Sequence, residues 1–425
     1  METALARAFG ALERAGITTC LLRDADRLDQ IASAGGEVDL LVRADQLIAL
    51  RRTLAEEGFV PLPAPGSAPH HFFIAYDRAS DAWLKLDVVT QIVFGRPPHT
   101  IPTDLAEACL SRRRRLGGAY APAPEEELVT LLLHAALDKG QFAPHRQQRL
   151  RALRQQITDP ARMTELLART WTLDATWERV SALIAGEQWD ALLAERPAVI
   201  AHLSRRAPAA RLGRLQHQVT RLAGRLEGLL RPPLPSVALM GPDGAGKSTL
   251  VKGLSEGFCQ PVTIVYMGLY QKGARRPSAL DRLPGVRFAR LLLTQWRRTL
   301  RARLAGARGH LVLFDRYSYD ALLNAPPQQN ALKRARRWIL ARACPPPDLV
   351  LVLDAPAETL WARKGEHSPE ILGAQRQAYR ALAGKLPQAR IVETGGAPGE
   401  SRRQASAAIW DVCVARSNGR TGKQR

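Results

Sequence analysis

A short glycine-rich segment constrains the fold of this chain more than any other feature. Val237–Met240 is a continuous apolar run, Gly241–Thr249 reads GPDGAGKST, and Leu250, Val251 and Leu254 follow at helical spacing. Glycines let consecutive backbone N–H groups point inward around an anion without Cβ clashes. A strand that leads through such a loop into the N-terminus of a helix is typical of a phosphate-binding α/β fold.

The residue types in this loop indicate which phosphate ligand it binds. Lys247 places a cation on the β- and γ-phosphates of a nucleotide, where charge moves during transfer. Ser248 offers its hydroxyl to Mg²⁺. We therefore expect ATP and Mg²⁺ as cofactors, with the nucleotide bound by the loop residues Gly241, Pro242, Asp243, Gly244, Ala245, Gly246, Lys247, Ser248 and Thr249.

The remainder of this region alternates apolar runs with helical patterns. Continuous apolar runs suit parallel strands covered on both faces, so we predict an α/β, doubly wound parallel sheet. The runs after the first are Val262–Met267, Leu311–Phe314, Leu349–Leu353 and Arg390–Val392. Asp315 and Arg316 directly follow one of them, at the strand end where open α/β sheets bind ligands. We expect Asp315 to orient Mg²⁺ and Arg316 to hold an acceptor phosphate.

Three segments together resemble thymidylate kinase and its close relatives, over roughly residues 235–415. They are GPDGAGKST, FDRYS and PDLVLVLDAPAETLWARKG, in that order. The resemblance implies an ATP- and Mg²⁺-dependent kinase that forms a homodimer. It also implies that Asp243 approaches the acceptor sugar and that Asp315 and Arg316 serve the acceptor phosphate and the metal.

The same resemblance implies a lid after the Leu349–Leu353 run. Gly244 stands where some members carry Arg, which indicates the subtype whose lid supplies the transition-state cations. Arg363, Lys364 and Arg376 are the candidates, and plain surface charge is the alternative. Thr394 and Gly395 stand where relatives enclose the adenine.

The acceptor half of the chain departs from that family. The segment after the second strand reads Tyr266–Pro277, YMGLYQKGARRP, and an Arg-rich helix is predicted at Val286–Arg308. Neither resembles a small pyrimidine pocket. The acceptor is therefore expected to be a nucleotide, a sugar or a sugar phosphate.

A second constellation of acidic residues lies near the N-terminus. Glu37 and Asp39 are two apart on a predicted strand, so they face the same side, and Asp87 lies on another. Three such carboxylates can hold two divalent cations. The pattern resembles the nucleotidyltransferases that modify small molecules, an α+β fold, although Leu22-Arg23-Asp24 stands where active members have a Gly-Ser turn. The alternative is a half-buried strand with solvated acids.

These patterns divide the chain into regions. We predict a nucleotidyltransferase-like domain at 1–122, a helical section at 123–231, a thymidylate kinase-like domain at 232–415 and a disordered tail at 416–425. The last helix of the middle section, Arg205–Arg231, alternates Arg and Leu. It either packs its Leu stripe on the next domain, which we favour, or lies on a membrane surface.

Composition narrows the classes of partner. The formal net charge is +21, with nine lysines and 52 arginines, which attracts anions. No nucleic-acid-binding signature is present, so no dedicated nucleic-acid partner is expected, while peripheral contact with anionic surfaces stays open. The five cysteines are scattered and never form C-x-x-C, and no apolar run is long enough to span a bilayer, so we expect a cytoplasmic protein.

The function predicted from these features is ATP-dependent phosphoryl transfer to a small-molecule acceptor. The alternative is nucleotidyl transfer at Glu37, Asp39 and Asp87, with the glycine-rich loop acting as a nucleotide sensor. A charge-driven module that binds nucleic acid or membranes is a third class, and it predicts strongly salt-dependent association.

Overall fold

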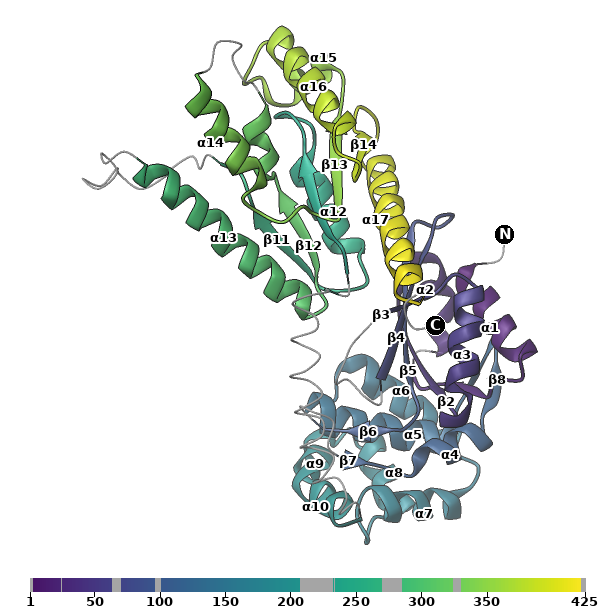
Figure 1. The fold of residues 1–425 in the computed structure, drawn as a ribbon. Coiled ribbons are helices and arrows are strands. Elements are labelled where there is room, and N and C mark those ends of the chain that lie inside the picture. The colour runs from purple at the N-terminus through teal and green to yellow at the C-terminus, as the bar shows by residue number, and fades with distance from the viewer. Residues whose placement is uncertain are drawn as a thin grey trace. The chain divides into compact units, whose positions relative to one another are not determined.

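The chain folds as two compact units, Met1–Gly224 (unit 1) and Arg225–Arg425 (unit 2), in a computed structural model (Figure 1). The structure describes residues 3–23, 25–62, 70–95, 101–206, 232, 234–269, 285–323 and 330–421. Residues 207–231 of the predicted Arg/Leu helix lie outside these ranges.

Unit 1 contains a five-stranded mixed sheet of order β1-β2-β5-β4-β3. β2 and β5 run parallel, while the other neighbouring pairs are antiparallel. The strands that were predicted to carry Glu37 with Asp39 and Asp87 are β2 and β5, whereas β4, the hairpin partner of β5, was not predicted. The strands of the sheet are β1 (Thr19–Leu21), β2 (Gly36–Val42), β3 (Val60–Leu62), β4 (His70–Asp77) and β5 (Ala82–Val89).

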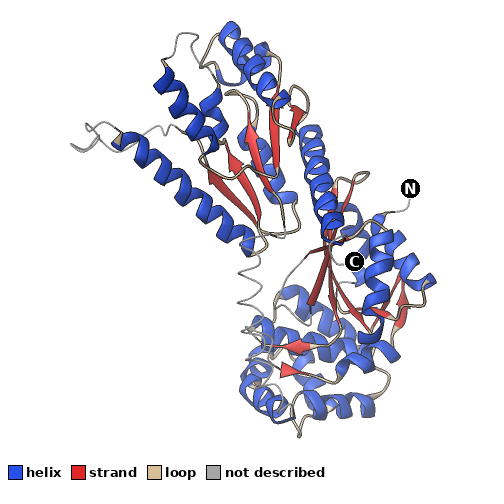
Figure 2. Cartoon of the chain, in the orientation of Figure 1, coloured by secondary structure: helices blue, strands red, loops and turns tan. Residues whose placement is uncertain are grey.

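Helices and short hairpins complete unit 1 (Figure 2). The helices that precede residue 122 are α1 (Ala4–Arg14), α2 (Leu28–Ala34), α3 (Leu47–Glu56) and α4 (Leu105–Ser111), with single turns η1 (Ala25–Arg27) and η2 (Ala44–Gln46). The two hairpins are formed by β6 (Val93–Phe94) with β7 (Ile101–Pro102) and by β8 (Arg114–Leu116) with β9 (Ala119–Ala121).

The section predicted to be helical at 123–231 contains helices as far as Arg206, where the described residues of this section end, and its core is continuous with that of the sheet. Cys20, Leu41 and Val89 of the sheet belong to the same buried cluster as Leu132 and Leu166 of the helical section. The sheet and the helices therefore share one core. The helices of this section are α5 (Pro124–Leu133), the π-helical turn η3 (His134–Lys139), α6 (Pro144–Arg154), α7 (Pro160–Thr170), α8 (Trp177–Ala185), α9 (Trp189–Ala194) and α10 (Arg196–Arg206).

Unit 2 contains the predicted all-parallel sheet, with order β11-β12-β10-β13-β14. The first strand of the unit, β10, lies in the middle, so the loop that follows it lies at the point where the strand order reverses. All five predicted runs form strands: β10 (Ser236–Met240), β11 (Val262–Tyr266), β12 (Leu311–Asp315), β13 (Leu349–Asp354) and β14 (Ala389–Glu393).

Helices cover both faces of this sheet, as Figures 1 and 2 show. Ala302 of α13 and Leu382 of α16 pack with Ala238 and Val350 of the strands in one buried cluster. The apolar central strands β10, β12 and β13 are consistent with this arrangement, because nearly all of their residues are buried, whereas the edge strands β11 and β14 are mostly half-buried or exposed. The helices are α12 (Lys247–Gly257), α13 (Val286–Ala307), the short helix η5 (Ser318–Leu322), α14 (Ala331–Arg342), α15 (Ala357–Lys364), α16 (Pro369–Gly384) and α17 (Pro398–Thr421).

The C-terminal residues differ from the predicted tail. Helix α17 continues to Thr421, so residues 416–421 are helical. Arg416 explains part of this order, because its guanidinium donates hydrogen bonds to the backbone oxygens of Pro232 (2.8 Å) and Leu234 (3.5 Å) and pairs with Asp348 at 2.9 Å. Within the described part of the chain, no helix has the length and apolar character needed to cross a bilayer.

Candidate functional site

The loop between β10 and α12 needs glycine at two of its positions. Gly241 has φ +150°, and a Cβ there would lie 2.8 Å from the backbone oxygen of Leu353. Gly244 has φ +84°, and its Cβ would lie 2.6 Å from the backbone oxygen of Leu360. The loop therefore packs against β13 and α15 as bare backbone, and the N-terminus of α12, which has no side-chain cap, presents N–H donors of the kind that suit an anion.

The side chain of Lys247 folds back over this loop. Its Nζ donates hydrogen bonds to the backbone oxygens of Gly241 (2.8 Å) and Pro242 (2.7 Å). Burial, with Arg316 adding a like charge, lowers the pKa of Lys247 from 10.5 to about 8. Ser248 and Thr249 are exposed in the first turn of α12. A buried cation beside open backbone donors is suited to an anionic ligand.

Asp315 and Arg316 stand at the end of β12, next to this loop. The backbone N–H of Arg316 donates to Leu239 O of β10 at 3.0 Å, and Arg316 adopts φ +64°. This left-handed conformation is rare for a residue other than glycine. It accompanies a turn in which the Arg316 guanidinium reaches Asp243 of the loop, with Nη2 2.7 Å from Oδ1.

Asp320 and Tyr379 complete this corner, and sequence reasoning missed both. Asp320 Oδ2 lies 3.7 Å from Arg316 Nη1, and the Tyr379 hydroxyl donates to Asp320 Oδ1 at 3.2 Å. Burial raises the pKa of Asp320 above its usual range, because Arg316 and Tyr379 offset only part of the desolvation. Its position four residues after Arg316 was the available sequence signal.

Asp354 ends β13 as Asp315 ends β12, but its surroundings differ. Arg376 donates to both of its carboxylate oxygens, at 2.6 and 2.9 Å, and Arg380 donates to Oδ2 at 2.5 Å. Burial alone would raise the pKa of Asp354, yet these two arginines outweigh it and hold the pKa below its usual range. Asp354 is thus satisfied by protein cations, whereas Asp315 is the strand-end carboxylate that borders the loop.

The three candidate lid cations lie in different places. Lys364 Nζ is 3.7 Å from Asp243 Oδ1, so it reaches the loop. Arg363 instead donates to the backbone oxygen of Thr394 at 2.8 Å, and Arg376 is bound to Asp354. The structure therefore brings Lys364 alone of these three candidates to the phosphate loop.

Thr394 and Gly395 lie beside the carboxyl end of β13. Thr394 N and Oγ1 both donate to Asp354 O, at 2.7 and 3.0 Å. A Cβ on Gly395 would lie 3.2 Å from Pro356 Cδ, so this turn also packs closely on the segment after β13.

The loop after α15 approaches the phosphate loop as well. Glu366 and His367, which sequence reasoning did not single out, have ligand atoms within 4.8 Å of those of Asp243. Glu366 Oε1 also lies 3.4 Å from Lys364 Nζ. Arg316, Lys247 and Lys364 together outweigh the burial of Asp243 and hold its pKa below the usual range.

A cavity of about 200 Å³ in unit 2 lies at the opposite end of the sheet. Its lining includes Ser236, Val312 and Asp348, which stand at the amino ends of β10, β12 and β13. It is therefore separate from the phosphate loop at the carboxyl ends of the strands.

In unit 1 the three predicted carboxylates converge. Asp39 of β2 and Asp87 of β5 are direct partners in the parallel register, and Glu37 lies two residues before Asp39. Carboxylate oxygens of the three lie within 4.8 Å of one another. The strand register thus produces the cluster that the spacing predicted.

Each of these carboxylates also faces a side chain that can carry positive charge. Lys85 Nζ lies 2.9 Å from Glu37, Arg23 Nε lies 3.3 Å from Asp39, and His70 Nδ1 lies 2.8 Å from Asp87.

Arg23 links this cluster to the helical section. Its Nη1 is 3.0 Å from His134 Nε2, and His134 Nδ1 is 2.8 Å from Asp138 Oδ2. Burial lowers the pKa of His134, which favours the neutral ring. Arg23, in the segment that stands in place of the expected Gly-Ser turn, thus contributes a cation directly beside the carboxylates.

Comparison with known proteins finds similarity among solved structures. No protein-family model and no curated protein sequence matches the chain. Among solved structures, the chain is similar to thymidylate kinase from Candida albicans, with 20% identity and a TM-score of 0.32. That match covers 41% of this chain and 91% of the kinase.

Proposed function

We propose that the chain is an ATP-dependent phosphotransferase whose acceptor is a small molecule of the nucleotide or sugar type. The observation that carries this proposal is the meeting of Lys247, Arg316 and Lys364 around Asp243 at the carboxyl edge of a parallel sheet. These three cations come from three different parts of unit 2: α12, the turn after β12, and α15. A loop that served only to connect β10 with α12 would not require them to converge.

The residues around the loop fit a nucleoside triphosphate. The close approach of the backbone at Gly241 and Gly244 leaves no room for side chains, and the uncapped N-terminus of α12 presents N–H donors. ATP would supply the phosphoryl group that is transferred. The loop N–H groups and Lys247 would hold the phosphates, and Thr394 and Gly395 would border the base.

Mg²⁺ fits the same edge of the sheet, because hydroxyl and carboxylate oxygens are its preferred ligands. Ser248 would offer its exposed hydroxyl, and Asp315 would offer a carboxylate at the end of β12. Asp354 is the poorer candidate, since Arg376 and Arg380 already occupy both of its oxygens.

In this proposal the protein contributes positioning and electrostatics. Lys247 and Lys364 would stabilise negative charge that develops on the transferred group. Asp243, Arg316 and Asp320 would orient the acceptor, because they form one connected cluster beside the loop. Residues 270–277 of the segment predicted to shape the acceptor pocket lie outside the described residues.

The test is ADP formation with Mg²⁺ and a panel of acceptors, comparing the full chain with Lys247→Ala. Lys252→Ala is the matched control, because Lys252 lies on the same helix α12 and is 77% exposed. We expect Lys247→Ala to abolish transfer without loss of fold, whereas Lys252→Ala keeps wild-type turnover. Turnover of Lys247→Ala within a few-fold of wild type would refute the proposal.

A second candidate function is nucleotidyl transfer in unit 1, which the convergence of Glu37, Asp39 and Asp87 favours. The cations Arg23 and Lys85 beside these acids weaken it, because they already balance part of the charge that divalent ions would neutralise. In the Lys247→Ala background, pyrophosphate release that is lost in Asp87→Asn would support this activity.

A further inference from the structure

Helix α13 carries a row of large apolar side chains on its solvent side. Leu293, Trp296, Leu300 and Leu304 are 52%, 63%, 58% and 41% exposed. They are three or four residues apart, so they lie on one face of the helix. The opposite face is occupied by the sheet, where Ala302 and Ala305 are buried. The exposed row is therefore not a part of the core of unit 2.

Helix α14 also carries large exposed apolar side chains. Of its twelve residues, all of which the structure describes, only Ala341 is buried. Leu332, Trp338 and Ile339 are 59%, 56% and 41% exposed. Most apolar side chains of this helix are therefore not part of the core of unit 2.

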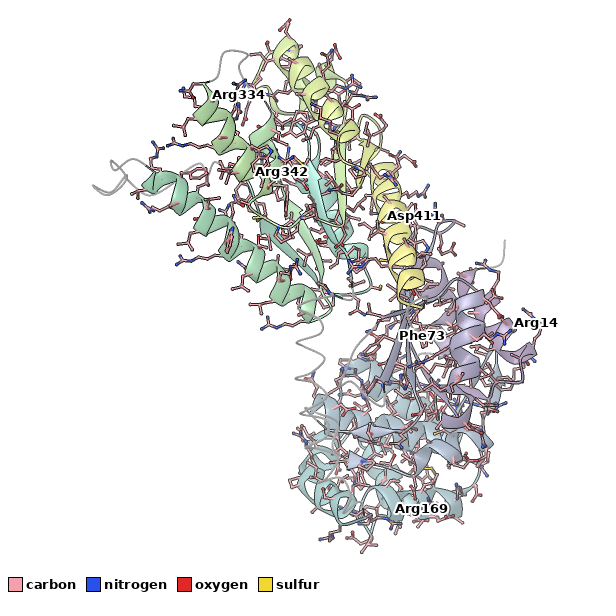
Figure 3. The ribbon with its side chains drawn as sticks, viewed as in Figure 1. Arg14, Phe73, Arg169, Arg334, Arg342 and Asp411 are labelled. Carbon is pink, nitrogen blue, oxygen red and sulfur yellow. The ribbon has the colours of Figure 1, made fainter. Side chains whose placement is uncertain are left out.

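The two helices are neighbours in unit 2. The Arg336 guanidinium of α14 lies over the Phe288 ring of α13, 5.9 Å from its centroid. Figure 1 shows the helices at the same side of the sheet, and Figure 3 labels Arg334 and Arg342 along α14. We call the surface the α13–α14 face, formed by Leu293, Trp296, Leu300, Leu304, Leu332, Trp338 and Ile339 with the arginines beside them.

The charge of this face is of one sign. α13 contains six arginines and α14 contains four arginines and one lysine, while neither helix contains Asp or Glu. On α13, Arg290, Arg297 and Arg301 follow the edge of the apolar row at helical spacing. A second copy of the chain docked by two-fold symmetry would bring like charges together, so the face is complementary to an anionic partner instead.

We propose that the α13–α14 face binds the surface of an anionic lipid bilayer. A row of three Leu and one Trp, bordered by arginines as on α13, is the composition of a helix that lies in a membrane interface. The apolar side chains enter the acyl boundary, the Trp rings remain at the headgroup level, and the arginines contact lipid phosphates. A nucleic acid would satisfy the arginines but would leave the Leu row in water.

The test is flotation of the full chain with vesicles of phosphatidylcholine containing phosphatidylglycerol, against vesicles of phosphatidylcholine alone. We expect binding to the anionic vesicles only, weakened by added salt. The double variant Trp296→Ser/Leu300→Ser should lower the partition coefficient by about tenfold or more, because two large apolar groups no longer enter the lipid. Arg297→Gln/Arg301→Gln should lower it by about tenfold as well, since each lost charge weakens attraction to the anionic lipid.

Matched controls remove similar groups elsewhere. Ile48→Ser/Leu173→Ser alters two residues of unit 1 that are 83% and 74% exposed, and Arg51→Gln/Arg52→Gln removes two exposed charges of α3. Both controls should bind as wild type does. Because all the substitutions are at exposed sites, circular dichroism should show an unchanged fold.

Three results would overturn the proposal. One is the absence of binding to anionic vesicles, and another is binding that the α13 variants leave unchanged. The third is a homodimer or a nucleic-acid complex that Trp296→Ser/Leu300→Ser disrupts in the absence of any vesicle binding. Phosphoryl transfer is measured separately, so its outcome does not bear on this inference.

Discussion

Arg316 donates a 2.7 Å hydrogen bond from Nη2 to Oδ1 of Asp243, which lies 73 residues earlier in the chain. This contact connects the turn after β12 with the phosphate loop after β10. It places a predicted acceptor-binding cation and a predicted acceptor-facing carboxylate in one cluster. The pairing follows from the parallel register, in which Leu239 of β10 is the partner of Asp315 of β12.

Arg316→Ala should impair use of the acceptor more than binding of the nucleotide. In the proposed site the guanidinium orients Asp243 and the acceptor, while the loop backbone and Lys247 would still hold the phosphates. We expect kcat/KM for the acceptor to fall by about 100-fold, with affinity for an ATP analogue changed by only a few-fold. Steady-state kinetics and calorimetry give the two values, and equal losses in both would contradict this division of roles.

Asp315→Asn should lower turnover by about 100-fold and leave ATP-analogue affinity nearly unchanged, because the amide keeps the size of the side chain but cannot supply the charge that holds Mg²⁺. Asp354→Asn is the matched control, at the same edge of the sheet. It should instead lower the free energy of unfolding by about 1–2 kcal/mol, since it weakens the three charge-assisted hydrogen bonds from Arg376 and Arg380. If Asp315→Asn reduces binding and turnover equally, Asp315 is a structural residue.

Lys364→Ala and Arg376→Ala should have different effects. Lys364 lies 3.7 Å from Asp243 and can reach a transferred phosphate, so its loss should lower kcat by about tenfold or more. Arg376→Ala should mainly lower the melting temperature, because it releases Asp354. Lys385→Ala, an exposed lysine after α16, controls for lost charge. A larger kcat effect for Arg376→Ala than for Lys364→Ala would reverse this assignment.

The buried Lys247 should make stability rise at alkaline pH. Its pKa is about 8 when folded and near 10.5 when unfolded, so below pH 8 both states are charged and burial of that charge is unfavourable. Between pH 8 and pH 10.5 Lys247 is neutral in the folded state but still charged in the unfolded state. The unfavourable free energy of burying its charge therefore disappears as the pH rises. The stability of the ligand-free wild type relative to Lys247→Met should therefore increase by about 3 kcal/mol across this window. Urea unfolding at pH 8 and pH 10.5 measures it, and parallel pH profiles would contradict it.

dTMP should be a poor acceptor or none. The segment Tyr266–Pro277 and the Arg-rich helix α13 do not resemble a small pyrimidine pocket, so polar groups would be left without partners when dTMP binds. A coupled ADP-release assay with dTMP, dUMP and a panel of sugars at equal concentration tests this. If dTMP is the best acceptor, with kcat/KM of ~10⁴ M⁻¹s⁻¹ or above, the prediction is wrong.

Local sequence determined the five parallel strands of unit 2 and the course of the phosphate loop. Continuous apolar runs are compatible with little except buried strands, and Gly241 and Gly244 adopt conformations that only glycine accepts at such close backbone contacts. The spacing of Glu37 and Asp39 likewise determined that they share a face, because alternation along a strand is a property of the backbone itself.

The tertiary structure alone decided which charged residues meet. Asp315 and Asp354 both end apolar strands and look equivalent in the sequence, yet only Asp354 is bound by Arg376 and Arg380. In the same way Lys364 reaches Asp243 while its neighbour Arg363 reaches Thr394. Which residues form these pairs depends on how the helices pack on the sheet. The spacing of the partners along the sequence does not reveal that packing.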